Sequence, residues 1–186
     1  VGADPVRLPL QGDAADAVLS VNDLEDFARF AQALETDTAG QAVQRVVILG
    51  GGLIGCEFAN DLLARGVVPT VVDVAEQVLP RLLPAQASAF LQTRLEAAGA
   101  QFKLGTGVVA VNRSASGLSV SLGDGSTLQA DVGLSAVGLK PRTELATLAG
   151  AAVGRGVQVN HLLATSVPHV HALGDCAEVE GLWLPY

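Results

Sequence analysis

The chain has 186 residues, 49% of them hydrophobic, which is enough to build the core of a globular protein. Its net charge of −8 argues against a general nucleic-acid or anionic-membrane surface, because such contacts depend on clustered lysine and arginine, and the sequence has no such cluster. No apolar run approaches the roughly 20 residues that span a bilayer, and no leader pattern indicates export. We therefore expect no membrane segment and a cytoplasmic location.

The first expected element is a helix that starts at Asn22-Asp-Leu-Glu25, a capping-box pattern, and runs to about Leu34. Phe27 and Phe30 fall on its apolar face. The polar stretch of residues 35–44 then indicates a linker and a domain boundary.

The next segment, Arg45-Val-Val-Ile-Leu-Gly-Gly-Gly-Leu-Ile-Gly-Cys-Glu57, combines a buried strand, a glycine turn and the start of a helix. The helix is expected to run to Arg65 and to end at Gly66, which can adopt a left-handed conformation. A strand, a glycine turn and a helix in this order predict a dinucleotide site.

Each glycine of the G-x-G-x-x-G pattern has a physical task in such a site. Gly50 permits the tight turn, Gly52 lets the backbone approach a pyrophosphate, and Gly55 lets the helix lie close to the strand. Gly51 has no assigned task. The phosphates are expected on free N–H groups at the helix N-terminus. The expected cofactor contacts of this segment are Gly50, Gly51, Gly52, Leu53, Ile54 and Gly55.

A second strand, residues 67–72, ends at Asp73, which follows Gly55 at close to the roughly 20 residues expected for a ribose-binding acid. A carboxylate accepts hydrogen bonds from the ribose 2′ and 3′ hydroxyls and repels a 2′-phosphate. No arginine occurs between Asp73 and Arg81 to offset that charge, so NADH is favoured over NADPH. The alternative is a structural βαβ turn in which Asp73 is a solvated acid.

The remaining pattern up to residue 137 predicts a helix over residues 85–98 and strands over 101–104, 108–111, 118–122, 127–130 and 132–137. Gly123-Asp-Gly125 supplies a hairpin turn, so the middle strands form an antiparallel meander. The expected fold class is α/β, a Rossmann-like three-layer domain with a parallel sheet and an antiparallel β-meander.

A second site signal lies near the C-terminus, where a short buried strand is expected over residues 170–173, before Gly174 and Asp175. Such an acid can accept a hydrogen bond from a ligand hydroxyl while the glycine admits a phosphate. An ordinary strand-to-turn Gly-Asp is the open alternative. His169 and His171 would point the same way from this strand, but no third metal ligand is nearby, so no metal is expected.

These motifs, in this order, resemble the pyridine nucleotide-disulfide oxidoreductase superfamily over the entire chain. Thr165, Gly174 and Asp175 match its T-x(8)-G-D motif, in which Asp175 would bind the ribityl chain of FAD. The opening Val1-Gly-Ala-Asp-Pro5 looks like its A/T-G-A-x-P crossover segment.

Ala136-Val-Gly-Leu-Lys-Pro141 looks like the superfamily's A-x-G-x-x-P segment, in which Gly138, with Val137 beside it, would pass near the nicotinamide half of the cofactor. Glu57 matches an acid that lies near the nicotinamide pocket in related reductases. The alternative for Glu57 is a first-turn glutamate stabilised by the helix dipole.

The resemblance implies that NADH passes a hydride to FAD and that reduced FAD passes electrons singly to rubredoxin or a similar small electron carrier. It also implies flanking pieces of an FAD-binding domain: residues 1–42 would end its first segment, 43–147 would form the NAD(H)-binding domain, and 148–186 would start its second segment. No catalytic side chain is assigned. A ferredoxin, nitrite or nitric-oxide-system reductase, or a non-catalytic NADH sensor, shares these motifs.

The chain contains no methionine and lacks the family's first FAD fingerprint, so we expect an internal fragment that alone is inactive and binds NADH weakly and FAD hardly at all. Cys56 and Cys176 are too far apart in sequence for a CxxC pair. Cys56 lies near a helix N-terminus, which can activate a thiol, but a buried unreactive cysteine is the favoured interpretation.

Overall fold

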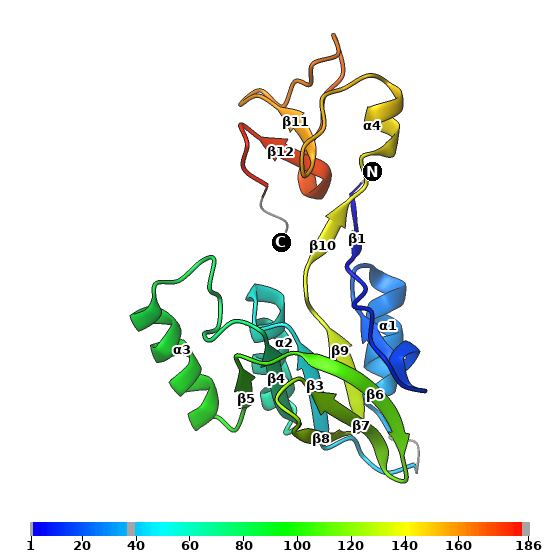
Figure 1. The fold of residues 1–186 in the computed structure, drawn as a ribbon, viewed down its shortest axis with the longest axis vertical. Helices are drawn as coiled ribbons and strands as arrows, with labels where there is room; N and C mark the ends of the chain where they lie inside the picture. The colour runs from blue at the N-terminus through cyan, green and yellow to red at the C-terminus, as the bar shows by residue number, and fades with distance from the viewer. Residues whose placement is uncertain (1, 37–39, 184–186) are drawn as a thin grey trace. The chain divides into compact units, whose positions relative to one another are not determined.

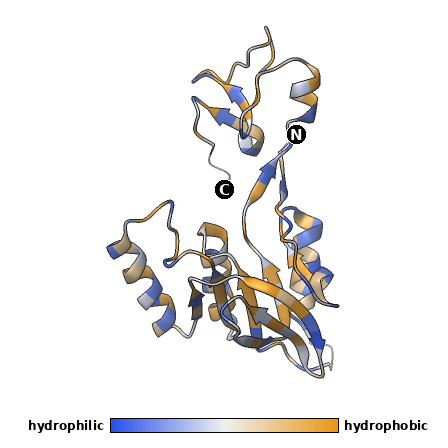
Figure 2. Ribbon diagram, viewed as in Figure 1, coloured by the Kyte–Doolittle hydropathy of each residue, from blue (hydrophilic) through white to orange (hydrophobic). Residues whose placement is uncertain are grey.

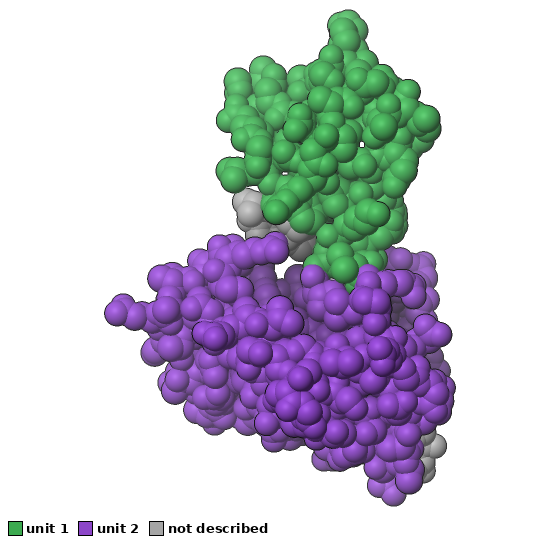
Figure 3. All heavy atoms as spheres, viewed as in Figure 1, with its two compact units in different colours: residues 1–6, 138–186 green, residues 7–137 purple. Residues whose placement is uncertain are grey.

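The computed structural model describes residues 2–36 and 40–183 (Figure 1). The predicted linker of residues 35–44 lies partly outside the described residues. By its internal contacts the chain divides into two compact units, one of residues 1–6 and 138–186 and the other of residues 7–137 (Figure 3). The domain boundaries expected after residues 42 and 147 stay a prediction.

The unit of residues 7–137 is built on a five-stranded parallel sheet with the strand order β2-β9-β3-β4-β5. In that order the strands are Val18–Ser20, Val132–Ser135, Arg45–Leu49, Val68–Asp73 and Gln101–Leu104. The carboxyl ends of parallel strands share one edge, so the ends of β3 and β4 meet there, which is where ligands bind in open α/β sheets.

Two layers cover the sheet. The helices α1 (Leu24–Ala33) and α2 (Leu53–Ala64) pack on one face against Val46 and Ile48, while Val47 and Leu49 point to the other face. This split follows from the alternation of side chains along a strand. Figure 2 shows hydrophobic colouring on the central strands. The architecture confirms the predicted three-layer α/β fold.

The antiparallel meander covers the second face. Its strands are β6 (Val108–Ser114), β7 (Gly117–Leu122) and β8 (Thr127–Ala130). The predicted turn at residues 123–125 joins β7 to β8, with Gly125 in the left-handed region at φ 85°. The helix α3 (Ala85–Ala97) packs beside α2 through a separate apolar cluster.

The N-cap of α1 differs from the prediction by one residue. Asp23, not Asn22, is the N-cap, and its carboxylate accepts the backbone N–H of Asp26 at 2.7 Å. Asp26 in turn accepts the N–H of Asn22 at 3.0 Å. Phe30 of this helix is buried in the core. Asn22 and Asp23 are both favoured N-cap residue types, so residue type alone does not choose between them.

The unit of residues 1–6 and 138–186 contains small pieces of sheet. The strand β1 (Ala3–Pro5) pairs antiparallel with β10 (Leu139–Pro141), which joins the two segments expected from the resemblance. The strands β11 (Val157–Val159) and β12 (Ala177–Val179) pair in parallel. The remaining elements are α4 (Glu144–Leu148) and the short 3-10 helices η1 (Ala15–Ala17, in the other unit) and η2 (Gly174–Cys176).

The expected buried strand over residues 170–173 is wrong. This segment makes only one isolated bridge, His171 to Ala164, and Leu173 is 68% exposed. A local turn competes with the strand, because His169 adopts a left-handed φ of 65° and the Val170 N–H bonds the Val167 carbonyl. None of the helices in residues 2–36 and 40–183 is long and apolar enough to cross a membrane.

Candidate functional site

The first glycine of the turn closes the end of β3 against its neighbours. Gly50 has φ 110°, and its N–H donates to the Val72 carbonyl of β4 at 2.8 Å. A Cβ at this position would lie 2.5 Å from the carbonyl oxygen of Ala136, just past β9. Both the conformation and the lack of space therefore require glycine.

The other two fingerprint glycines have different surroundings. A Cβ on Gly55 would lie 1.9 Å from the Gly50 carbonyl oxygen, so α2 reaches the turn only without a side chain there. A Cβ on Gly52 would meet nothing within 4 Å. Gly52 is the N-cap of α2, and no side chain caps that end. The first N–H groups of α2, including those of Leu53 and Ile54, therefore have no acceptor within the helix and no capping side chain.

Asp73, at the end of β4, is tied to the glycine turn. Its Oδ2 accepts the N–H of Gly51 at 2.5 Å, and its Oδ1 accepts the N–H of Ala75 at 2.8 Å. Gly51 therefore has the task that sequence reasoning missed. The only signal in the sequence was a third glycine at a position the fingerprint leaves open.

The carbonyl of Gly51 is also engaged. It accepts the backbone N–H of Leu79 at 2.8 Å, and the Cys56 thiol lies 3.6 Å from it in donor geometry. Leu79 is buried and has a left-handed φ of 47°, an unfavourable conformation for leucine. The loop that follows Asp73 is thus held to Gly51 at its start, through Asp73, and near its middle, through Leu79.

Cys56 is buried on α2. Burial, together with the nearby charges of Asp73 and Glu57, raises the pKa of its thiol to about 11. An activated cysteine needs a lowered pKa, so the buried, unreactive interpretation is the one that agrees with the structure.

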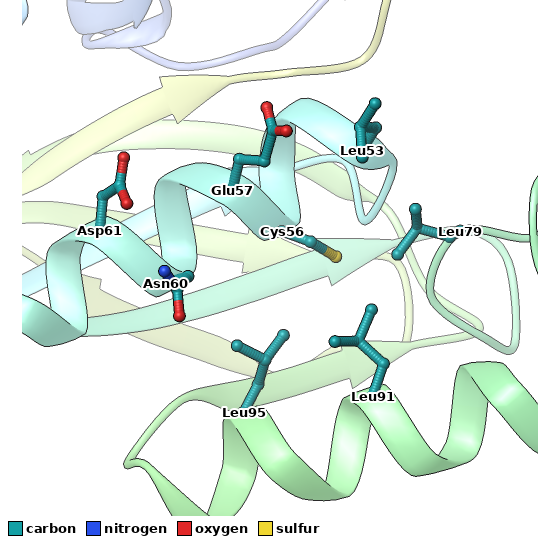
Figure 4. A pocket seen from close by; sticks show the side chains of 8 residues that line it. All are labelled: Leu53, Cys56, Glu57, Asn60, Asp61, Leu79, Leu91 and Leu95. Carbon is teal, nitrogen blue, oxygen red and sulfur yellow. The ribbon is translucent and has the colours of Figure 1, made fainter.

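A pocket of about 490 Å³ opens between α2 and α3 (Figure 4). Its lining is Leu53, Cys56, Glu57, Asn60, Asp61, Leu79, Leu91 and Leu95. Figure 4 shows the leucines of α3 opposite α2, with the polar side chains along α2. Glu57 is exposed and lies beyond the first turn of α2, which contains no acid, so the first-turn alternative is wrong.

Val137 and Gly138 follow β9. Val137 is half-buried and packs against the cluster that contains Leu49 and Val72. Gly138 is exposed with φ 109°, and a Cβ there would meet nothing within 4 Å. The backbone at Gly138 is therefore open to a ligand.

Gly174 and Asp175 belong to the unit of residues 1–6 and 138–186. Gly174 opens η2 with φ 73° and has free space around its Cα, while Asp175 is half-buried and its carbonyl accepts the Trp183 Nε1–H at 2.9 Å. The Thr165 hydroxyl donates to the Val170 carbonyl at 2.9 Å, inside the preceding turn. Thr165 thus stabilises the turn that precedes η2.

Metal ligands do not gather in the described part of the chain, which holds no group of three or more His, Cys, Asp or Glu side chains suited to a metal ion. His161 lies 3.5 Å from Glu180. His169 and His171 do not lie on a regular strand, so the geometry considered for them from the sequence is not formed.

The geometry as a whole fits a dinucleotide. The open Gly52 Cα and the uncapped N-terminus of α2 have the form of a cradle suited to phosphate oxygens, and the Asp73 carboxylate lies at the end of the adjacent strand, the position typical of a ribose-binding acid. The open backbone at Gly174 and the Asp175 side chain fit a second phosphate-bearing ligand with hydroxyl groups.

A family model and several relatives of the chain point to the same family of proteins. A family model described as pyridine nucleotide-disulphide oxidoreductase matches residues 1–184. The rubredoxin-NAD(+) reductases of Acinetobacter baylyi and Alcanivorax borkumensis are 46% and 48% identical to the chain over its whole length. A nitric oxide reductase FlRd-NAD(+) reductase of Vibrio vulnificus is 39% identical. The chain spans 47% of the length of each of these relatives.

Solved structures of reductases have the same fold as this chain. A ferredoxin reductase from Rhodopseudomonas palustris matches 97% of the chain at 31% identity with a TM-score of 0.85, and the match covers 43% of that protein. Putidaredoxin reductase, in a covalent complex with putidaredoxin, matches 96% of the chain at 32% identity with a TM-score of 0.84, also over 43% of its length.

Proposed function

The chain belongs to the pyridine nucleotide-disulphide oxidoreductase family, and from this premise we propose that it is the NADH-binding part of an FAD-dependent reductase that passes electrons to rubredoxin or a similar small electron carrier. The observation that carries the proposal is the joint geometry of Gly52 and Asp73. An open helix N-terminus for phosphate and a strand-end carboxylate for ribose stand side by side on one sheet edge.

In this proposal the backbone N–H groups that start α2 bind the pyrophosphate. Asp73 accepts the two adenosine ribose hydroxyls, because each of its oxygens holds one backbone N–H and keeps a further lone pair free. The same negative charge repels the 2′-phosphate of NADPH, so NADH is the preferred cofactor.

We assign the nicotinamide half to the segment after β9. The open backbone of Gly138, next to Val137, admits the flat ring. Glu57 on α2 is assigned to the nicotinamide pocket by its match to the family's acid, and its side chain is exposed. Both assignments rest on the family resemblance together with the exposure of these residues.

Gly174 and Asp175 are proposed to hold FAD, with Asp175 accepting a ribityl hydroxyl and Gly174 admitting the phosphates. Bound FAD would supply the two-electron acceptor for the hydride of NADH and a donor of single electrons to the carrier. The protein side chains position the two cofactors and take no covalent part.

The acceptor is proposed from the relatives. The two relatives at 46% and 48% identity are rubredoxin-NAD(+) reductases, which favours rubredoxin. The 39% identity to nitric oxide reductase FlRd-NAD(+) reductases makes the FlRd of such a system the second candidate. A cytoplasmic location stays a prediction.

The test uses the full-length, flavin-loaded protein that carries this chain. NADH is mixed with it in a stopped-flow spectrophotometer and the flavin absorbance is followed, after which rubredoxin or FlRd is added and its own absorbance is followed. We expect NADH to bleach the flavin and rubredoxin to reoxidise it. A flavin that stays oxidised would contradict the reductase function, whereas turnover with FlRd alone would change only the acceptor.

A further inference from the structure

The backbone of Gly51 joins Asp73, through its N–H, to Leu79 and Cys56, through its carbonyl. We propose that Cys56, acting through the Gly51 carbonyl, is a positioning residue for the Asp73 carboxylate and so for the choice of NADH over NADPH. This inference rests on the proposed NADH function and deepens it. Cys56 itself touches no cofactor atom in this scheme.

The link from Gly51 to Asp73 is direct. The N–H of Gly51 lies 2.5 Å from Oδ2 of Asp73, and the Ala75 N–H lies 2.8 Å from Oδ1. A hydrogen bond to a carboxylate is stronger than one between neutral groups. The orientation of the Gly50–Gly51 peptide, which carries this N–H, therefore sets the plane in which Asp73 offers its remaining lone pairs, and the φ and ψ angles of Gly51 link that peptide to the next one, which carries the Gly51 carbonyl.

The bond from Cys56 restrains the carbonyl group of Gly51, whereas the bond to Asp73 uses its N–H. The Gly51 carbonyl accepts from the Leu79 N–H at 2.8 Å and from the Cys56 thiol at 3.6 Å. Figure 4 shows the Cys56 sulfur on the side of α2 that faces Leu79. With its pKa raised to about 11, the thiol keeps its proton at neutral pH and stays a donor.

The intrinsic conformation of Gly51 does not fix its orientation, so its hydrogen bonds have to. Its φ is not in the left-handed region, and an added Cβ would be in ordinary contact, 3.4 Å from the Asp73 side chain. Glycine has more backbone freedom than any other residue, so a glycine that orients a ligand-binding carboxylate is held by its hydrogen bonds. Apart from the bond to Asp73 itself, the bond from the Cys56 thiol is the one of these that a side-chain substitution can remove.

The experiment compares Cys56→Ala with Cys56→Ser in the full-length, flavin-loaded protein. Both variants lose the sulfur, but only serine keeps a donor. We expect Cys56→Ala to raise the KM for NADH about twofold to fivefold, the size of a weak S–H···O bond, with kcat within twofold of the parent. The NADH-to-NADPH ratio of kcat/KM falls by a similar factor, and Cys56→Ser restores both values.

A structural control comes from the same apolar cluster. Leu95 is buried beside Cys56, and Leu95→Ala should lower stability in urea without changing the NADH-to-NADPH ratio. A spectroscopic readout is the Gly51 amide proton in a ¹H–¹⁵N spectrum. Its bond to the carboxylate places it far downfield, and it should move upfield in Cys56→Ala but not in Leu95→Ala.

Two results separate this inference from the proposed function. If Asp73→Ala does not weaken NADH binding, the proposed NADH site is wrong. If Asp73→Ala weakens NADH binding while Cys56→Ala leaves both the cofactor ratio and the Gly51 amide unchanged, only the positioning role is wrong. A ratio that shifts equally in Cys56→Ala and Leu95→Ala also overturns the role.

Discussion

The carbonyl oxygen of Gly50 occupies the space that a side chain on Gly55 would need, with only 1.9 Å between that oxygen and an added Cβ. This contact fixes how closely the first turn of α2 approaches β3. Gly52, in the same turn, has no neighbour within 4 Å of an added Cβ. The two glycines therefore separate the folding requirement of the fingerprint from its binding requirement.

Gly55→Ala is expected to destabilise the protein by roughly 3 kcal/mol, because the added methyl group would meet the backbone carbonyl of Gly50, which cannot move aside as a flexible side chain can. Gly52→Ala should change stability by less than about 1 kcal/mol, the range seen at N-caps. Its methyl group would instead enter the phosphate cradle and raise the KM for NADH on the order of tenfold. Urea unfolding and steady-state kinetics check the pair, and a Gly52→Ala variant with normal NADH affinity would remove the cradle assignment.

Asp73→Ala should weaken NADH more than NADPH. Loss of hydrogen bonds to a charged acceptor costs about 1.5–3 kcal/mol, which corresponds to a rise in KM of roughly tenfold to a hundredfold for NADH. NADPH gains because the repulsion of its 2′-phosphate disappears. Steady-state kinetics with both cofactors measure the ratio. Glu76→Ala removes a nearby exposed acid and is the control, which should leave the cofactor ratio unchanged. An equal loss of affinity for both cofactors in Asp73→Ala would contradict the ribose contact.

The strand, turn and helix around Gly50 were predictable because all the needed signals are local. A four-residue apolar run, a glycine turn and helical periodicity follow each other within residues 45–65, and the hairpin at residues 123–125 has the same local character. Asp73 was predictable as a strand end, and the family resemblance added the two segments that pair as β1 and β10.

The contacts of Gly51 were not predictable, because they join residues that only the folded sheet brings together. The Gly51 amide and Asp73 are 22 residues apart in sequence, and no residue pattern marks a backbone donor. The strand expected over residues 170–173 failed for the opposite reason. Its apolar residues satisfied the local pattern, but His169 takes a left-handed φ and the Val170 N–H bonds the Val167 carbonyl, so a local turn forms there.

Asp131 should make stability depend on acid pH. Burial alone would raise its pKa, but the Arg45 side chain and the backbone N–H groups of Gln44 and Arg45 outweigh burial and lower the pKa below its ordinary value of 3.8. A lowered pKa means that the native state favours the charged form. The stabilisation is therefore complete above pH 4 and is lost as the pH falls through the lowered pKa.

Asp131→Asn should accordingly be less stable than the parent at pH 7, and the difference should shrink as the pH is lowered from 4 toward 2. Urea unfolding at several pH values measures this. Asp16→Asn, at an exposed carboxylate, should show no such convergence. If the difference in the free energy of unfolding between Asp131→Asn and the parent were the same at all pH values, the native state would not favour the charged form of Asp131, and the prediction would be wrong.

Leu79 offers a test of backbone strain at the edge of the candidate site. Its φ of 47° costs an L-residue roughly 1–2 kcal/mol, a penalty that glycine does not incur. Leu79→Gly and Leu79→Ala remove nearly the same buried side chain, so their difference isolates the backbone. We expect the glycine variant to be the more stable by about 1 kcal/mol in urea unfolding.

At Leu63, inside α2, the same two substitutions should rank in the reverse order by a similar amount, because glycine is the poorer helix former. Alanine more stable than glycine at both positions would mean that residue 79 relaxes out of the left-handed region in solution, and the Leu79 N–H would then no longer reach the Gly51 carbonyl.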